Sequence, residues 1–331
     1  MVRSPNSRQR VARILADNGW EPWPFYVTFW WSLLQSGSGQ YIRFAKYRKL
    51  MIILGAVNCG NSSVPLVSII NDASEAEALA SQCRTFWGNI QMGTNASGDI
   101  YLEGITNITG DLISERTLIT SIQSQTLIQV ASLDIDNDGT LQTISLPHLQ
   151  AISTTLWIYD MPKLKTIDLS SLDGSGSLFF VSSTPSLEVL RLLPSINYGS
   201  MASLFISNTN LTFIDAFGSG QGSISIGDNQ RLSNVSVRTI DADVSNVNNS
   251  MVNGTGWVSI YQNGPAVNIS LPNLTNVQGP VTLRNCSELS IPDLNIVNGS
   301  IVMDNASFRF LSAPNLSVIN GDLNITGSFT G

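Results

Sequence analysis

The chain has 331 residues, of which 43% are apolar, 12% are charged and one is histidine, and its formal net charge is −7. This apolar share is enough for a large core, which excludes disorder for most of the chain. Charged residues are about half as frequent as in ordinary soluble domains. We therefore expect amides, hydroxyls and attached sugars to keep the surface soluble.

The charge is divided unevenly along the chain. Residues 1–50 hold eight Lys/Arg against two acidic residues, whereas the remaining residues hold nine basic and twenty-two acidic side chains. Phosphate binding needs Lys and Arg to displace counterions, so an acidic body of this kind repels nucleic acid. Nucleic acid is excluded as a partner.

The first 58 residues have the pattern of an atypical leader. Two apolar runs, FYVTFWWSLL at 25–34 and LMIILGAV at 50–57, each follow basic residues. Both have the length of a signal-peptide core, and neither reaches the roughly eighteen residues that span a bilayer. We favour the second run as the secretory signal. An ordinary disordered extension is the alternative.

Residues 72–82, DASEAEALASQ, carry the clearest helix signal, because an Asp or Ser cap precedes an Ala-rich run. The cysteines Cys59, Cys83 and Cys286 are too few for a disulfide scaffold and lack the spacing of a metal site. In an oxidising compartment Cys59 and Cys83 could close a loop. Cys286 would then be unpaired, and we expect it to be a small buried residue.

From about residue 88 onward, two apolar residues separated by one position recur, mostly every 20 to 26 residues. The pairs are Leu133/Ile135, Leu156/Ile158, Leu178/Phe180, Leu204/Ile206, Ile224/Ile226, Val258/Ile260, Val281/Leu283, Ile301/Met303 and Leu323/Ile325. This period is typical of leucine-rich and other β-solenoid repeats, and the pairs predict short strands with inward side chains. We therefore expect a mainly β, right-handed β-solenoid of leucine-rich/receptor-L-domain-like repeats with a short N-terminal helix.

A second pattern, Leu-x-x-Ile-x-Leu-Pro-x-Leu-x-x-Ile, occurs at 141–152, again at 267–277 and more loosely at 308–319. Its Leu-x-x-Ile steps predict tight corners. Four prolines fall between the strands, where a missing N–H does least harm: Pro147, Pro272, Pro292 and Pro314.

An Asn or Asp follows many of the first strands. These residues are Asn137, Asp160, Asn208, Asn229, Asn285 and Asn305. Stacked at one corner, they would form a ladder of side chains bonded to turn backbone. We expect Asn285 and Asn305 to be inward structural residues of this ladder, although each lies in an Asn-x-Ser/Thr sequon.

Fourteen sequons lie between residues 61 and 331, ten of them between 234 and 324. Together with a signal-like leader they indicate the secretory pathway, although an Asn/Ser/Thr-rich repeat also generates sequons automatically. Excluding the two ladder residues, the predicted glycosylation sites are Asn61, Asn95, Asn107, Asn210, Asn234, Asn248, Asn253, Asn268, Asn273, Asn298, Asn315 and Asn324.

The sequence predicts no catalytic, cofactor-binding or metal-binding residues. His148 is the only histidine and is expected at the surface. Residues 134–139, DIDNDG, copy the first half of an EF-hand loop, but its twelfth position is Ser145, where a Glu is required. The enzymatic alternative is a β-helix polysaccharide-degrading enzyme, which would need three or more carboxylates, or carboxylates with Arg, in one groove.

The segments CRTFWGNI at 83–90 and GDIYLEGITNITGDL at 98–112 closely resemble the opening of the fungal GPI-anchored cell-wall organisation glycoproteins, which have receptor-L-domain-like repeats. Further matches are LFISNTNLT at 204–212, DNQRL at 228–232 and SAPNL at 312–316. The resemblance covers residues 60–331 or so. It implies a glycosylated ectodomain with no known catalytic residues, and it matches Cys59 and Cys83 to the family's paired cysteines.

The resemblance implies a non-enzymatic secreted protein of the cell wall or cell surface that contributes to wall organisation and integrity. Its partners would be wall glycans or wall glycoproteins, and it would contact a membrane only through a GPI anchor. The chain stops at Gly331 within a repeat, so we expect residues 59–331 to be a C-terminally truncated solenoid. The alternative is a receptor-like or adhesive ectodomain for a protein or glycan ligand. A sequon-free face carrying clustered exposed aromatics would distinguish the two.

Overall fold

The computed structural model describes residues 57–60, 66–176, 178–192, 203–219, 222–240 and 256–329. These residues all belong to one compact unit, Gly55–Gly331. The apolar run at 25–34 and all but the last residue of the run at 50–57 lie outside the described residues, so the predicted leader is not described.

The predicted helix is confirmed as α4 (Ala73–Gln82). Asp72 is its N-cap, and its Oδ1 accepts hydrogen bonds from the Glu75 backbone N–H at 2.9 Å and from Ser74 Oγ at 2.6 Å. These two hydrogen bonds hold the pKa of Asp72 below its usual value, and the bond from Ser74 has the larger effect. Ala76 and Ala80 on one face of α4 are buried, so the helix packs against the first coils.

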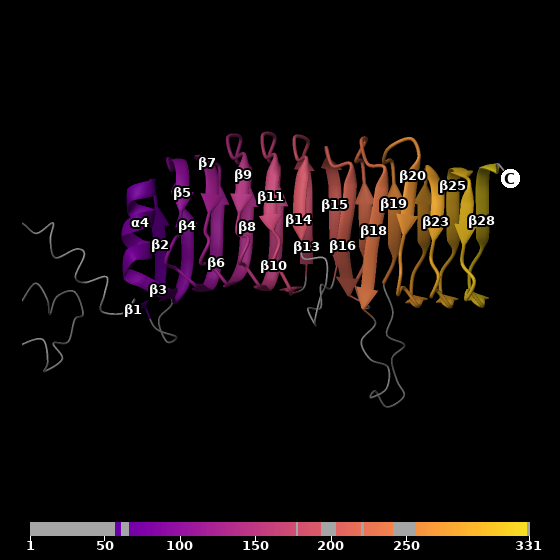
Figure 1. Ribbon diagram of the computed structural model, residues 1–331, viewed down its shortest axis with the longest axis horizontal. Coiled ribbons are helices and arrows are strands. Elements are labelled where there is room, and N and C mark those ends of the chain that lie inside the picture. The colour runs from indigo at the N-terminus through magenta and orange to yellow at the C-terminus, as the bar shows by residue number, and fades with distance from the viewer. Residues whose placement is uncertain are drawn as a thin grey trace, which may run out of the picture. The chain divides into compact units, whose positions relative to one another are not determined.

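The predicted solenoid is confirmed: parallel strands stack into about ten coils, which lie side by side in Figure 1. One face is a 15-stranded long sheet. Its main path is β1 (Val57–Cys59), β3 (Cys83–Phe86), β6 (Asn107–Glu115), β8 (Gln129–Asp136), β10 (Ala151–Tyr159), β13 (Leu178–Thr184), β15 (Leu204–Thr209), β17 (Ile224–Gly227), β19 (Val258–Tyr261), β22 (Val281–Arg284), β25 (Ile301–Phe308) and β28 (Leu323–Phe329). Beside this path lie β2 (Leu66–Ile70), β4 (Gly88–Met92) and β12 (Gly174–Ser175).

Three shorter sheets close the other sides of the coils. The first holds β5 (Ser97–Tyr101), β7 (Leu118–Gln123), β9 (Thr143–Ser145), β11 (Thr166–Leu169) and β14 (Val189–Leu192). The second, which we call the lateral sheet, holds β16 (Phe213–Ser219), β18 (Asn234–Ile240), β20 (Val267–Ser270), β23 (Cys286–Ser290) and β26 (Phe310–Ser312). The third holds β21 (Asn276–Val277), β24 (Ile296–Val297) and β27 (Val318–Ile319).

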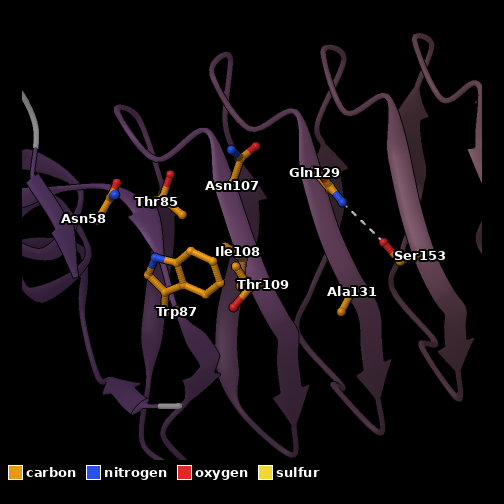
Figure 2. Close-up of a pocket in the computed structure, with 9 residues that line it drawn as sticks. All are labelled: Asn58, Thr85, Trp87, Asn107, Ile108, Thr109, Gln129, Ala131 and Ser153. Atoms are coloured by element: carbon orange, nitrogen blue, oxygen red, sulfur yellow. Dashed lines mark hydrogen bonds between the residues drawn. The ribbon is translucent and has the colours of Figure 1, made fainter. Parts of the chain in front are cut away.

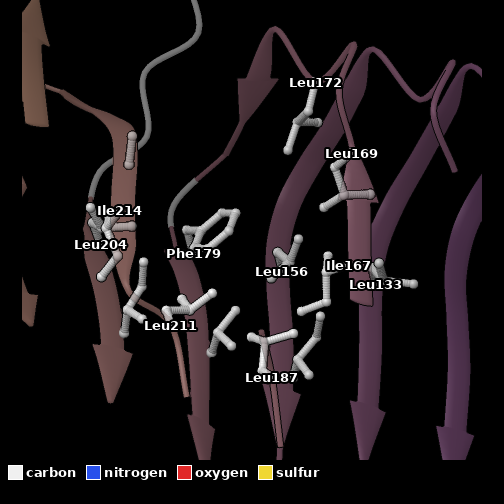
Figure 3. Packing of buried hydrophobic residues seen from close by; sticks show 14 of the residues in the cluster. Leu133, Leu156, Ile167, Leu169, Leu172, Phe179, Leu187, Leu204, Leu211 and Ile214 are labelled. Atoms are coloured by element: carbon white, nitrogen blue, oxygen red, sulfur yellow. The ribbon is translucent and has the colours of Figure 1, made fainter. Parts of the chain in front are cut away.

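The core is one continuous stack of aliphatic side chains inside the coils. Leu133, Leu156, Phe179 and Leu204 come from successive coils, Ile167 lies in the same coil as Leu156, and all five are fully buried (Figure 3). A single coil could not bury this surface alone, so each coil is stabilised by its neighbours.

The tight corners lie at the Leu-Pro-x-Leu and Ile-Pro-x-Leu steps. They were predicted at the Leu-x-x-Ile steps, but the isoleucines that end two of these steps are strand residues, Ile144 in β9 and Ile152 in β10. The Leu149 backbone N–H donates to the Leu146 carbonyl at 3.1 Å, and the Leu294 N–H donates to the Ile291 carbonyl at 3.3 Å. Both leucines are buried. The proline of each step lies in the turn, where no strand hydrogen bond is lost.

One predicted strand pair is wrong by one residue. In β13 the buried side chains are Phe179 and Val181, whereas Leu178 and Phe180 are only partly buried and face outward. The segment LFFV is apolar at every position, so its alternation does not indicate which face is the core, and a shift of one residue reverses the two faces.

The predicted ladder is half right. Asn137, Asp160, Asn208, Asn285 and Asn305 do stack at one corner, where each has a left-handed backbone with φ between 51° and 58°, a conformation that Asn and Asp tolerate. The inward assignment of Asn285 and Asn305 is wrong: Asn285 is only partly buried, Asn305 is exposed, and Asn305 Nδ2 donates to Asn285 Oδ1 at 2.6 Å. At this corner, a residue with a left-handed backbone points its side chain away from the inside of the coil.

The inward ladder is formed by the next residue of each coil. Asn229 is fully buried, and its Nδ2 donates to the Ile206 carbonyl at 3.2 Å and to Asn263 Oδ1 at 3.0 Å. In earlier coils the same position is Asp138, which is also fully buried and accepts hydrogen bonds from Ser114 Oγ and the Thr117 backbone N–H. These bonds satisfy polar groups that would otherwise be costly to bury.

Candidate functional site

The outward face of the long sheet carries a cluster of aromatic side chains. We call Trp157, Tyr159, Phe180, Phe205 and Trp257 the aromatic platform. Strand register puts Trp157 beside Phe180 and Phe180 beside Phe205, because residues on neighbouring parallel strands lie about 4.8 Å apart. The platform therefore runs across several coils, along the solenoid axis.

The rings of the platform touch one another. Trp157 and Phe180 are stacked with centroids 4.0 Å apart and planes 7° apart. Phe205 lies 6.1 Å from Phe180 and meets Trp257 edge-on at 5.9 Å. Tyr159 lies 6.2 Å from Trp157, and 38% of its surface is exposed. The result is a continuous, solvent-facing aromatic surface held by pairwise ring contacts.

A row of small hydroxyl side chains borders the platform. In register with Tyr159 come Ser182 and Ser207, whose Oγ atoms are 2.8 Å apart. The adjacent coil has Gly227 at the same position, and a Cβ there would lie 2.4 Å from Tyr261 Cζ. The ring of Tyr261 on β19 therefore lies over Gly227, so this row combines the Ser182 and Ser207 hydroxyls with a further aromatic ring.

Four carboxylates adjoin the platform on the preceding strands. We call Asp111, Glu115, Asp134 and Asp136 the acidic patch. Asp134 is paired in register with Trp157, and Asp136 with Tyr159. Burial raises the pKa of Asp134 above its usual value, and repulsion from Asp136, Asp111 and Glu115 adds to the effect. This patch lies on an open sheet face, not in a groove.

The EF-hand-like segment does not gather its carboxylates. Asp134 and Asp136 face outward, whereas Asp138 is buried inside the coil. Over the described ranges, no group of three or more His, Cys, Asp and Glu residues is arranged to hold a metal ion. His148 is exposed, as predicted.

The structure places the three cysteines in two settings. Cys59 and Cys83 have Cα atoms 5.4 Å apart and their sulfurs are bonded, which joins β1 to the end of α4. Cys286 is free and buried, as predicted, and burial raises the pKa of its thiol to about 12. A thiol of this kind is unreactive at neutral pH.

A groove of about 310 Å³ lies on the long sheet near its N-terminal end (Figure 2). Trp87 and Asn107 face it from neighbouring coils, and on its far side Gln129 Nε2 donates to Ser153 Oγ at 3.4 Å. Its lining residues have no ionisable side chain: Asn58, Thr85, Trp87, Asn107, Ile108, Thr109, Gln129, Ala131 and Ser153. The groove offers amides, hydroxyls and one indole, but no acid or base.

A second groove of about 340 Å³ lies on the lateral sheet. Phe213 and Phe310 line it and are 51% and 56% exposed. Asn234 and Asn268 lie between them on adjacent strands, and Asn268 Nδ2 donates to Asn234 Oδ1 at 3.2 Å. Both asparagines are in sequons, so glycans attached here would cover this groove.

The described sequon asparagines are all at least partly accessible. Asn95, Asn234, Asn273, Asn298, Asn315 and Asn324 are exposed, and Asn107, Asn210 and Asn268 are partly buried. Asn61, Asn248 and Asn253 lie outside the described residues. Strands β10, β13 and β15, which carry all of the platform except Trp257, contain no sequon. Trp257 lies just before β19 and two residues after the sequon at 253–255.

Sequence reasoning missed the platform, although part of its signal was readable. The alternation that puts Leu156 and Ile158 inward also puts Trp157 and Tyr159 outward. Phe180 was assigned to the core by the register error in β13. Trp257 precedes its strand and could not be placed beside Phe205 from the repeat alone.

The chain is similar to fungal proteins over most of its length. It is 25% identical over 269 residues to Protein ecm33 of Aspergillus fumigatus, a match that covers 81% of this chain and 58% of the relative. It is 26% identical over 259 residues to Cell surface GPI-anchored protein of Arthroderma benhamiae, with 78% and 57% covered. It is 24% identical over 271 residues to Sporulation-specific protein 2 of Saccharomyces cerevisiae, with 77% and 44% covered.

These relatives confirm the predicted resemblance to the fungal GPI-anchored cell-wall glycoproteins and support the predicted cell-wall or cell-surface location. The chain spans about half the length of the curated relatives it matches. No family model matches it. No solved structure matches it. No helix in the described part of the chain has the length and hydropathy of a membrane span.

Proposed function

We propose that this chain is a non-enzymatic, wall-associated surface protein whose aromatic platform binds wall glycan and so helps to organise the wall. The observation that carries the proposal is the stacked, outward-facing Trp157–Phe180 pair on strands without sequons. Flat aromatic rings offer a large contact area at low entropic cost, and they match the flat C–H faces of pyranose rings. The neighbouring Ser182 and Ser207 hydroxyls can hydrogen-bond sugar hydroxyls.

The similarity to fungal surface proteins supports a wall-associated, non-enzymatic protein. The platform adds a ligand-binding surface to that description. A sequon-free face with clustered aromatic side chains is the feature expected of an adhesive ectodomain. Adhesion to glycan would therefore be the means by which the protein acts in the wall.

The test compares two aromatic double variants in binding to insoluble fungal wall glycan. Trp157→Ala/Phe180→Ala removes the stacked pair, and Phe213→Ala/Phe310→Ala removes two exposed rings from the lateral sheet as a matched control. We expect the platform variant to bind about tenfold or more weakly, because two contacts of about 0.5–1.5 kcal/mol are lost. Wild-type binding in the control, with circular dichroism unchanged in both, is expected.

Equal losses in the two variants, or no glycan binding by the wild-type protein, would contradict the proposal. Binding that depends on Phe213 and Phe310 alone would move the site to the lateral-sheet groove.

A second candidate function is glycoside hydrolysis on the same face. It is favoured by the raised pKa of Asp134, since a general acid needs a raised pKa. The carboxylates lie on an open sheet, however, and the names of the relatives state no enzymatic activity. Incubation with wall glycans and a reducing-sugar assay decides the question: we expect no release above that of Asp134→Asn.

A further inference from the structure

The acidic patch and the aromatic platform form one continuous surface. Strand β8 pairs with β10, so Asp134 lies beside Trp157 and Asp136 lies beside Tyr159. Glu115 is in register with Asp136 on the next strand. A ligand that lies along the solenoid axis on the platform would therefore reach the carboxylates at one end.

These carboxylates are not neutralised by the protein's own cations. Within the described part of the chain, Asp111, Asp134 and Asp136 have no ion pair, and Glu115 meets only the exposed Arg116, at 3.4 Å. Elsewhere on the same sheet face, Asp304 is in register with Arg284, and their side chains are 3.5 Å apart. On the outward face of the long sheet, as far as the structure describes it, the carboxylates that no cation neutralises are therefore on β6 and β8, the two strands before the platform.

This arrangement costs stability unless a ligand offsets it. Glu115 and Asp136 are directly opposite each other on adjacent strands, and like charges in that relation destabilise a sheet. The pKa of Asp134 is raised first by burial and then by the same kind of repulsion, from Asp136, Asp111 and Glu115. A cationic ligand would relieve this repulsion, whereas an anionic ligand would add to it.

We propose that the ligand of this face is a cationic amino-sugar polymer, a β-linked chain of glucosamine units with free amino groups. Its pyranose rings stack on Trp157 and Phe180, and its ammonium groups lie beside Asp134 and Asp136. Ammonium groups over Trp or Tyr rings also gain cation–π attraction. This inference rests on the proposed function, which it deepens by naming the charge of the glycan.

A basic protein partner fits this face less well. Protein interfaces concentrate their binding energy in anchor side chains that enter pockets. The two grooves described above are lined by neither Trp157 nor Phe180 and by none of the four acidic-patch residues. A linear glycan needs only a flat aromatic surface and aligned charges, and the long sheet offers both.

The test measures binding of the full chain to three hexasaccharides by calorimetry at pH 5.5 and low salt. The ligands are the fully deacetylated β-1,4-glucosamine hexamer, its fully N-acetylated counterpart and a neutral β-1,3-glucan hexamer. Because exposed ion pairs each contribute modestly, we expect the deacetylated hexamer to bind about tenfold more tightly than the acetylated one. Salt should reduce this preference.

Two double variants of equal charge change test the residues. Asp134→Asn/Asp136→Asn removes the charges next to the platform, and Asp293→Asn/Asp322→Asn removes two exposed charges elsewhere. None of the four substitutions creates a sequon. We expect the first variant to lose the preference for the deacetylated hexamer while keeping its affinity for the acetylated one, and the second to behave as wild type.

The outcomes separate this inference from the proposed function. Equal affinity for the two β-1,4-linked hexamers, or a preference that survives Asp134→Asn/Asp136→Asn, overturns the amino-sugar inference. So does a lysine hexapeptide that competes as well as the deacetylated hexamer. Binding of the acetylated or neutral hexamer that is lost in Trp157→Ala/Phe180→Ala would still uphold the proposed function. If no hexamer binds in a Trp157-dependent way, both fail.

Discussion

The platform coils, residues 129–209, which hold all of the platform except Trp257, and the sequon-rich coils, residues 234–325, share one interior and differ on the surface. Ile158 and Ile260 occupy the same inward column and are both fully buried. At the outward position beside them, the platform coils have Trp157 and the sequon-rich coils have Ser259. The solenoid thus repeats its core and varies its exterior, so that one stretch presents the proposed binding surface and the other presents most of the sequons.

The largest expected effect comes from moving a glycan onto the platform. Ser207→Asn creates an Asn-x-Thr sequon with the existing Asn208 and Thr209, between Ser182 and Gly227 on the outer face. In protein secreted from a glycosylating host, we expect an attached glycan to cover Phe205 and abolish glycan binding. Pull-down with wall glycan, before and after enzymatic deglycosylation, measures this effect.

Ser207→Gln is the control, because it removes the same hydroxyl without creating a sequon. We expect it to keep most of the binding. Undiminished binding by fully glycosylated Ser207→Asn protein would show that this face is not the binding surface.

A large and equal loss of stability is expected from the shared core. Ile158→Ala and Ile260→Ala each remove a fully buried side chain, and each should cost about 2–4 kcal/mol of unfolding free energy. Urea denaturation followed by far-ultraviolet circular dichroism measures both. A cost confined to one variant would mean that the two stretches differ inside as well as outside.

A smaller difference is expected at the inward ladder position. Asp138→Ala leaves Ser114 Oγ and the Thr117 N–H buried without their partner, so we expect a loss of about 2–3 kcal/mol. At the equivalent position of the sequon-rich coils, Cys286→Ala removes only a small buried thiol and should cost about 1 kcal/mol. Similar costs for the two, measured by urea denaturation, would argue against a structural role for the Asp138 hydrogen bonds.

The smallest expected effect is a pH dependence of opposite sign at two aspartates. The folded-state pKa of Asp134 is raised, so the stability contributed by its protonated form is present at low pH and is lost as pH rises through that pKa. Asp134→Asn should therefore stabilise the protein at pH 7 by a few tenths of a kcal/mol, after solvent screening. This gain should disappear at acid pH.

Asp99 is the contrasting position, since hydrogen bonds from Thr120 and then Ser121 lower its pKa. Its stabilisation is present at neutral pH and is lost as pH falls through the lowered pKa. Asp99→Asn should therefore destabilise the protein slightly at pH 7 and have little effect in acid. Urea midpoints at pH 7 and pH 3 for both variants test this, and shifts of the same sign would contradict the electrostatic account of the acidic patch.

The core of this fold could be predicted well from the sequence, and its outward aromatic face poorly. The pairs Leu156/Ile158 and Val258/Ile260 alternate clearly with less buried neighbours, so their inward direction could be predicted. The LFFV segment has no such alternation, and its register came from the hydrogen bonds to β10 and β15. The ladder was placed correctly at Asn229 and one residue too early in the other coils, because the left-handed φ of residues such as Asn285 does not follow from residue type alone.

By itself, the sequence determined that the chain is a solenoid with apolar inward pairs, prolines between the strands and a capped N-terminal helix, because each of these depends on residues near one another in the chain. Only the tertiary structure decided which outward residues are neighbours. Successive coils differ in length, so Trp157, Phe180, Phe205 and Trp257 are unevenly spaced in the sequence. Their rings touch because backbone hydrogen bonds between parallel strands hold the coils in register, whatever the number of residues between one strand and the next.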